Sequence, residues 1–387
     1  MRESMRLMCW LMLVLVCVGC VQREHAAEDI AHDVCASRGG VGGFAAGHRF
    51  QFILTEVRGG KRVDSEFRAD AEYFYPASTV KLVGAVAALH EMRELGAPLD
   101  RPILWYDVDD PGRALFASDG SVPRLDRELA RMLIVSDNEA FNLCFDLAGP
   151  GAMNGLMWDA GFGSVRIEHR LSRTVKPPNR TAAGPVEVQT DHGAVRLERR
   201  EGPAEWPAVS EETVGVGFMR GDTLVKEPMR FTHHNRISLR DLHELVIALS
   251  RPELTDRKLP IAEADRVMMQ RLMGTLPREC RDPVFDPATF PDDWGKYFLS
   301  GVRRVAPDAR IENKVGLAYG FLTDASRVVD PATGREFFLT ATVYVNSDGV
   351  LNDDAYDYET VGLPLLADLG EAAAARVFGR GGEITSR

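Results

Sequence analysis

Strand-forming segments lie at both ends of this chain, and a mainly helical stretch lies between them. Residues 48–57 and 61–74 are rich in β-branched and aromatic residues and are separated by a Gly-Gly pair, which is a hairpin signal. Residues 309–329 and 336–346 have the same character near the C-terminus. This order favours an α+β fold in which one antiparallel sheet, built from both chain ends, is flanked by helices and carries an inserted all-helical subdomain.

The middle of the chain supplies most of the helical segments. We predict helices within residues 78–94, 124–149, 149–162, 237–254 and 261–274, and a final helix over 358–377. Residues 172–232 differ, because Pro, Gly, Thr and charged residues dominate there and periodicity is weak. We predict a loop-rich insertion in this region, with a hairpin around 214–225. The insertion either decorates the surface or shapes a cleft, and the sequence leaves both open.

Residues 1–20 are predicted to be an export signal rather than part of the fold. Two arginines precede an apolar run over residues 7–19, which is too short to be a comfortable membrane span. The run ends at Cys20 behind small residues and resembles a bacterial lipobox, so we expect a lipid on Cys20 and a place in the periplasm or cell envelope. Plain secretion or an uncleaved anchor is the alternative. Residues 21–44 would form a tether and the start of the first helix, and residues 45–380 one domain.

The composition excludes some partners. A formal charge of −11 over 387 residues argues against nucleic acid and against an anionic membrane face, since both need a basic surface. We therefore expect a small-molecule substrate, a membrane contact only through the N-terminal lipid, and a monomer. Cys35, Cys144 and Cys280 remain after the signal; one disulfide is possible, but the sequence does not pair them. No Cys–His spacing predicts a metal site, and no cofactor is expected.

The stretch "YPASTVKL" (75–82) places Ser78 at the start of an apolar helix and Lys81 one turn behind it. Residues three apart share a helix face, so the amine can reach the hydroxyl. A serine hydroxyl is a poor nucleophile without an adjacent base, and a desolvated lysine can be that base. The plainer alternative is a helix-capping serine followed by a lysine that extends to the surface.

Two further motifs follow Ser78-Thr79-Val80-Lys81 in the chain. Ser136-Asp137-Asn138 falls in a polar break between helices, and Lys314-Val315-Gly316 falls on a predicted strand. An S-x-x-K, S-D-N and K-T-G trio in this order is the signature of class A β-lactamases and penicillin-binding proteins. Residues 45–380 therefore resemble a class A β-lactamase-like serine hydrolase.

The resemblance implies a role for each motif residue. Ser78 would be the acylated nucleophile and Lys81 its base, and Ser136 would pass a proton to the leaving nitrogen. The backbone N–H groups of Ser78 and Leu317 would form the oxyanion hole.

The resemblance also assigns the substrate contacts. Asn138 would hold the substrate amide. Lys314, in the segment that contains Gly316, would bind the substrate carboxylate and adjust the reactivity of Ser136. Val315 departs from the pattern, because the hydroxyl that usually lies between Lys and Gly is missing there. We expect weaker binding of penicillins as a result.

A second departure concerns the group that activates water for deacylation. Aligning Arg166-Ile167-Glu168 with the Arg-Leu-Asp of the family places Leu171 where the catalytic glutamate belongs, and Glu168 becomes a structural acid. A shifted register would instead make Glu168 the catalytic base. Another base could come from the insertion, where His192, Glu211 and Glu212 are available. His233 and His234 lie at its end, and a pair of surface histidines is the plainer interpretation of these two. Glu139, beside the second motif, is expected to be a solvated helix residue.

The motifs together predict an exported serine hydrolase that forms an acyl-enzyme at Ser78 and hydrolyses β-lactam or related amide bonds. A peptidase or esterase acting on peptidoglycan peptides, with slow β-lactam deacylation, is the second candidate. A non-catalytic lipoprotein that binds wall fragments is the third, and the five intact motif residues argue against it.

Overall fold

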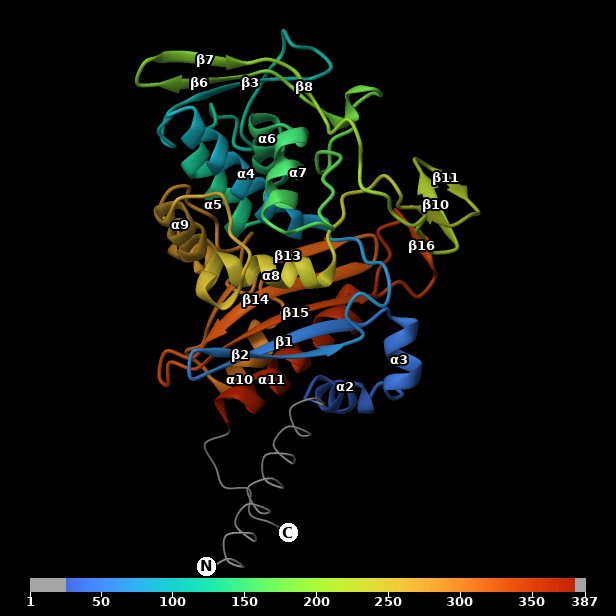
Figure 1. Cartoon of the computed structure of the whole chain (residues 1–387). Coiled ribbons are helices and arrows are strands. Elements are labelled where there is room, and N and C mark those ends of the chain that lie inside the picture. The colour runs from blue at the N-terminus through green and yellow to red at the C-terminus, as the bar shows by residue number, and fades with distance from the viewer. Residues whose placement is uncertain (1–25, 380–387) are drawn as a thin grey trace, which may run out of the picture.

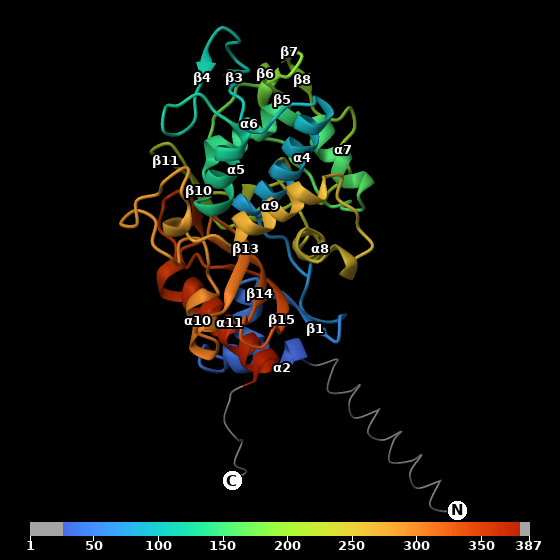
Figure 2. The same cartoon turned by 90° about the vertical axis from the view of Figure 1, so that its left-hand side faces the viewer.

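The computed structural model describes residues 26–379. The predicted export signal and Cys20 lie outside the described residues. In both views α2 (Ala26–Ala36) and α11 (Leu363–Phe378) lie at one end of the molecule, and β6 (Val186–Thr190) and β7 (Gly193–Leu197) lie at the other (Figures 1 and 2).

The central sheet is built from both ends of the chain, as predicted. Its five antiparallel strands run in the order β13-β14-β15-β1-β2. They are β1 (Gln51–Arg58), β2 (Lys61–Phe67), β13 (Arg310–Ala318), β14 (Phe321–Val329) and β15 (Glu336–Tyr344). The strand-forming segment 309–329 consists of two strands, because Tyr319 and Gly320 both adopt positive φ and form the turn between them.

Helices cover both faces of this sheet (Figure 1). On one face, α2, α10 (Leu299–Val305) and α11 enclose a core that contains Phe52, Leu339 and Leu369. On the other face, α8 (Leu239–Ser250) packs on β14 and β15. This arrangement confirms the predicted α+β architecture.

The inserted subdomain is built around α4 (Lys81–Glu94), which is buried along most of its length. Around it lie α5 (Leu125–Ile134), α6 (Asn138–Ala148), α7 (Pro150–Asp159) and α9 (Glu263–Gly274). Gly84 allows α6 to approach closely, since a Cβ atom there would lie 2.9 Å from the Phe141 ring. The subdomain is not helical throughout: β3 (Ile103–Tyr106) and β4 (Ala114–Leu115) form a four-stranded sheet with β6 and β7.

The 172–232 insertion contains eight short strands, including β6 and β7. The others are β5 (Ala182–Ala183), β8 (Arg200–Glu201), β9 (Thr213–Val214), β10 (Gly217–Arg220), β11 (Thr223–Val225) and β12 (Met229–Arg230). The hairpin expected around 214–225 is formed by β10 and β11, and β10 also pairs in parallel with β16 (Val350–Leu351).

The start of the insertion is fixed to α6 by one buried carboxylate. Asp146 accepts hydrogen bonds from Trp105 Nε1 at 2.8 Å, from the Gly184 backbone N–H at 2.7 Å and from the guanidinium of Arg170. Arg170 and Asp146 form a buried ion pair, and removing one partner of such a pair typically costs about 3–5 kcal/mol. The chain on both sides of residue 172 is therefore held rigidly against the subdomain.

The structure also describes the three remaining cysteines and the lengths of the helices. Cys35, Cys144 and Cys280 are all free thiols, so the possible disulfide is not formed among them. Within residues 26–379, no helix is long and apolar enough to cross a membrane.

Candidate active site

The serine of the first motif lies in a tight turn that precedes α4. Residues Ala77–Val80 form one turn of 3-10 helix, and Ala77 has a φ of 46°, in the left-handed region. Thr79 stabilises the turn, because its hydroxyl donates to Pro76 O at 2.8 Å. Ser78 thereby lies at the edge of the cleft, while Lys81 begins the buried helix.

The amine of Lys81 lies among the other motif residues. Its Nζ atom is 2.9 Å from Ser78 Oγ, 3.1 Å from Ser136 Oγ and 2.7 Å from Asn138 Oδ1. It also lies 2.5 Å from the backbone oxygen of Ser136. The lysine is fully buried, so the first two motifs, far apart in sequence, meet at one nitrogen.

Ser136 reaches this position through an unusual backbone conformation. Its φ is 62°, which a residue with a side chain adopts only when its surroundings enforce it. The adjacent Asp137 caps α6 by accepting from the Ala140 N–H at 3.0 Å. Asn138, the first residue of α6, accepts from Lys81 and donates through Nδ2 to Ser172 Oγ at 2.8 Å.

The third motif lies on β13, directly beside the serine turn. Lys314 Nζ donates to Ser136 Oγ at 2.9 Å, so this hydroxyl lies between two lysines. A Cβ atom on Gly316 would lie 2.3 Å from Pro76 O, so only glycine lets the strand approach the turn this closely. Leu317, the next residue, borders the same space as Ser78.

Burial controls the protonation of both lysines. Desolvation, followed by the positive charge of Lys314, places the pKa of Lys81 well below its usual value. Desolvation, opposed by Asp324 and reinforced by Lys296, lowers the pKa of Lys314 to about 7. A neutral amine 2.9 Å from a serine hydroxyl can accept its proton, which is the chemistry that an acyl-enzyme requires.

The low pKa of Lys314 should make the stability of the protein depend on pH. Between pH 7 and 9 the unfolded lysine keeps its proton while the folded one loses it, so the free energy of unfolding should rise with pH. Lys314→Met should reduce this slope by up to about 1.4 kcal/mol per pH unit. Urea unfolding at pH 7, 8 and 9 measures it, and Lys61→Met, at an exposed lysine, is the matched control. Equal slopes in wild type and Lys314→Met would contradict the assignment.

Ser78 opens onto two cavities. The first, here called the Trp294 cavity, has a volume of about 490 Å³ and includes Ser78, Ser136, Asn138, Trp294, Val315 and Leu317. The second, the Leu171 cavity, has a volume of about 540 Å³ and includes Ser78, Asn138, Leu171, Arg180, His234 and Leu317. Ser78, Asn138 and Leu317 border both, so the reacting bond of a substrate would lie between them.

Glu168 is not placed to act as the catalytic base. Its buried carboxylate pairs with Arg166 Nε at 2.5 Å and lies 3.4 Å from His233 Nδ1, and the residue borders neither cavity at Ser78. Leu171 borders the Leu171 cavity, and Asn142 fixes it by accepting from its N–H at 2.8 Å and donating to its carbonyl at 3.0 Å. The geometry therefore favours the structural role that the motif alignment gives Glu168 over the catalytic role of the shifted register.

Most of the other candidate bases do not reach the serine. His192, Glu211, Glu212 and His233 border neither cavity, and Glu139 is paired with Arg173. His234 does border the Leu171 cavity. Burial is the main cause that lowers the pKa of His234 to about 3, and electrostatic interactions with His169, Arg180 and His233 lower it further. His234 is therefore neutral but a weak base.

Several residues of the site carry no motif signal. Asn142 lies one helical turn after Asn138 on α6, and this spacing was the one available clue to its role. Trp294 forms a wall of its cavity and donates through Nε1 to Val135 O at 3.1 Å. Arg180 comes from the insertion, where no periodicity marks it.

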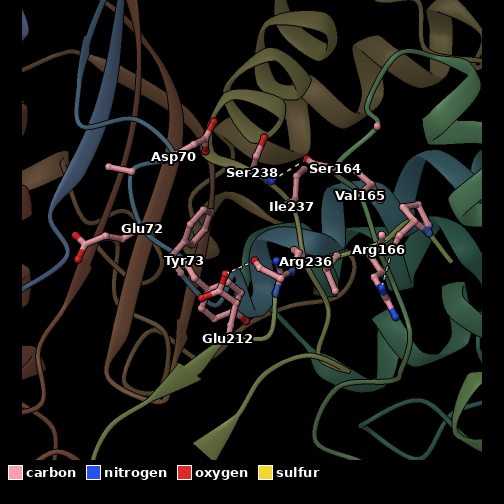
Figure 3. Close-up of a pocket in the computed structure, with 17 residues that line it drawn as sticks. Asp70, Glu72, Tyr73, Ser164, Val165, Arg166, Glu212, Arg236, Ile237 and Ser238 are labelled. Atoms are coloured by element: carbon pink, nitrogen blue, oxygen red, sulfur yellow. Dashed lines mark hydrogen bonds between the residues drawn. The ribbon is translucent and has the colours of Figure 1, made fainter.

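A third cavity, of about 430 Å³, lies behind the Arg166 segment and does not include Ser78 (Figure 3). Asp70, Tyr73, Ser164, Arg236 and Ser238 are among its lining residues. The Ser238 backbone N–H donates to Ser164 Oγ at 2.9 Å, which joins the two sides of this cavity. Glu212, one of the candidate bases, borders it, but none of the residues of the three motifs does, so it is separate from the cleft at the serine.

Comparisons with known proteins agree with this geometry. The model of the β-lactamase enzyme family matches residues 44–362. No curated protein matches the chain. Among solved structures, the β-lactamase from Sphaerobacter thermophilus is 16% identical with a TM-score of 0.53, over 90% of this chain and 96% of that one.

Two further solved structures have the same fold. The β-lactamase from Streptomyces albus G is 17% identical with a TM-score of 0.51, over 90% of this chain and 99% of that one. A PBP-A mutant, solved as an acyl-enzyme complex with penicillin-G, is 14% identical with a TM-score of 0.52, over 90% and 96% of the two chains.

Proposed function

Because the chain belongs to the β-lactamase enzyme family and is a class A β-lactamase-like serine hydrolase, we propose that it forms an acyl-enzyme at Ser78 from β-lactams or related amides. The observation that carries the proposal is the position of Lys81 Nζ, 2.9 Å from Ser78 Oγ, in a buried site that lowers the pKa of the amine and so favours its neutral form. The proposed export rests on residues 1–20 and the proposed lipid on Cys20.

The acylation step follows from the contacts. Lys81 accepts the Ser78 proton while Oγ attacks the substrate carbonyl, and the backbone N–H groups of Ser78 and Leu317 receive the developing oxyanion. Ser136 Oγ then gives its proton to the leaving nitrogen as the C–N bond breaks. Ser136 Oγ recovers a proton from Lys81 Nζ, 3.1 Å away. Until it does, Lys314 Nζ, 2.9 Å away on the other side, stabilises the negative charge on this oxygen.

The described residues of the site supply no strong base for the second step, deacylation. Hydrolysis of the ester at Ser78 requires a base that activates water, and the Leu171 cavity contains no carboxylate among its described residues. His234, the titratable group nearest to that role, is a weak base. We therefore propose fast acylation and slow deacylation. A PBP-A mutant of the same fold has been solved as an acyl-enzyme complex with penicillin-G.

One experiment tests both steps. The mature protein is incubated with a fluorescent penicillin and with a chromogenic cephalosporin, and intact mass and turnover are followed. We expect a covalent adduct that persists, is absent in Ser78→Ala, and is accompanied by little turnover. Rapid turnover would show that deacylation is efficient, and the absence of both adduct and turnover would overturn the β-lactam assignment.

A second candidate function, hydrolysis of small esters or amides, is favoured by the Trp294 cavity. Val315 supplies no hydroxyl for a substrate carboxylate, and Asp293 and Glu359 add negative charge to the lining. Lys296 also borders this cavity, but its Nζ donates to Met273 O, Ile311 O and Asn313 Oδ1, each at 2.9 Å, so its N–H groups are already occupied by protein oxygens. A leaving group without a carboxylate would suit this cavity better than that of a penicillin. Turnover of neutral p-nitrophenyl esters that is lost in Ser78→Ala tests this candidate.

A further inference from the structure

In the proposed acyl transfer, the two cavities at Ser78 take different halves of the substrate, and the position of Ser136 indicates which half each receives. Its hydroxyl lies where a proton can be passed to the leaving group, and it borders the Trp294 cavity but not the Leu171 cavity. The leaving group must therefore point into the Trp294 cavity. The acyl part of the substrate, which stays attached to Ser78, occupies the Leu171 cavity.

The Leu171 cavity has a positive lining. Arg170, Arg173 and Arg180 border it, and none of its described lining residues is Asp or Glu. His169 and His234 also border it, but burial lowers the pKa of each, to about 4 and about 3, so both are neutral. The positive charge of this cavity therefore comes from the arginines.

Of these three arginines, Arg180 is the one that forms no ion pair with a carboxylate of the described residues. Arg170 pairs with the buried Asp146, and Arg173 pairs with Glu139 and stacks on the Trp105 ring. Within residues 26–379, no carboxylate lies within ion-pair distance of Arg180; its guanidinium donates to the backbone oxygen of His233 at 2.5 Å. That contact orients the side chain and leaves its other N–H groups able to bind a ligand.

We propose that Arg180 binds an anionic group on the acyl part of the substrate, so that the enzyme prefers amides, esters or β-lactams whose acyl arm carries a carboxylate. This inference rests on the proposed function, because it assumes acyl transfer to Ser78. Arg180 belongs to the 172–232 insertion, which gives this segment a role in selecting substrates. An arginine and a carboxylate form paired, charge-assisted hydrogen bonds, so the preference should be measurable in a partly open cavity.

Benzylpenicillin and its α-carboxy derivative, carbenicillin, provide a matched pair of substrates. They share the same leaving half and differ only by one carboxylate on the acyl arm. The second-order rate constant for acylation of the wild-type protein should be about tenfold higher for carbenicillin. Arg180→Gln should remove this preference, and Arg180→Lys, which keeps the charge, should retain part of it. Adduct formation by mass spectrometry measures all of these rates.

The control variant is Arg196→Gln, which removes the same charge from β7, far from both cavities. Its preference should equal that of the wild type. Equal acylation rates for the two penicillins in the wild-type protein, or a preference that survives Arg180→Gln, would overturn the inference and leave the proposed function standing.

Failure of acylation by either penicillin would instead count against the proposed function. The subsite is then tested by binding alone, in calorimetry with Ser78→Ala protein and two ligands, neutral phenylacetamide and its α-carboxy derivative, phenylmalonamate. Phenylmalonamate should bind about tenfold more tightly, and Arg180→Gln in the same background should abolish the difference. Equal affinities would overturn the inference in this form as well.

Discussion

Lys81→Met should slow acylation of Ser78 by about 10²–10⁴-fold, the range expected when a general base is removed. The methionine side chain is similar in size and apolar, and the lysine is already buried with a lowered pKa, so the fold should tolerate the change. The loss would then belong to the chemistry, because no other neutral amine lies within reach of Ser78 Oγ among the described residues. The rate constant for adduct formation, measured by intact mass, tests this expectation.

The thermal unfolding midpoint of Lys81→Met controls for a folding defect. The matched variant is Lys314→Met, which removes the other lysine beside Ser136 but not the one beside Ser78. It should slow acylation less, since the nucleophile keeps its base. Acylation by Lys81→Met at the wild-type rate would show that another group activates the serine.

Leu171→Glu should turn a long-lived acyl-enzyme into one that hydrolyses, raising the deacylation rate by about 10²–10⁴-fold. Leu171 borders the cavity that holds the acyl group, and Asn142 fixes its backbone from both sides. A carboxylate here would face the ester beside Arg180, with Ser172 and Asn138 available to position water. Decay of the adduct after removal of free penicillin, followed by mass spectrometry, measures the rate.

Leu171→Gln is the matched control, because it has the same length and polarity without a base. It should deacylate far more slowly than Leu171→Glu. If both variants lose the adduct at the same rate, solvent access rather than general-base catalysis limits deacylation in the wild type.

The motifs predicted which residues meet in the proposed acylation site. Ser78, Lys81, Ser136, Asn138 and Lys314 lie together as the resemblance implies, because each is fixed by a local feature: a tight turn, a capped helix start or a strand register. The sheet built from both chain ends was also predictable, since long strands with β-branched residues carry a strong signal.

The rest of the site depends on contacts that local patterns do not encode. The strands of the insertion are short, so their pairing is set by the body of the protein rather than by their own sequence. The partner of Glu168 is Arg166, but only the folded loop shows that this pair borders neither cavity at the serine. Asp146 pairs with Arg170 and Glu139 pairs with Arg173, which leaves Arg180 without an ion pair. No sequence pattern encodes these pairings.

Because the insertion is attached to Asp146, one part of the protein fixes the reacting groups, and another part can change without moving them. The reacting groups come from the serine turn, α6 and β13, whereas Arg180 comes from chain that is fixed to α6 just before and just after it, at Arg170 and Gly184. Changes between these two anchors can alter the acyl-side lining without moving the nucleophile or its base. New substrate preferences could therefore arise in this protein by substitution in one short segment, at little cost to the reaction itself.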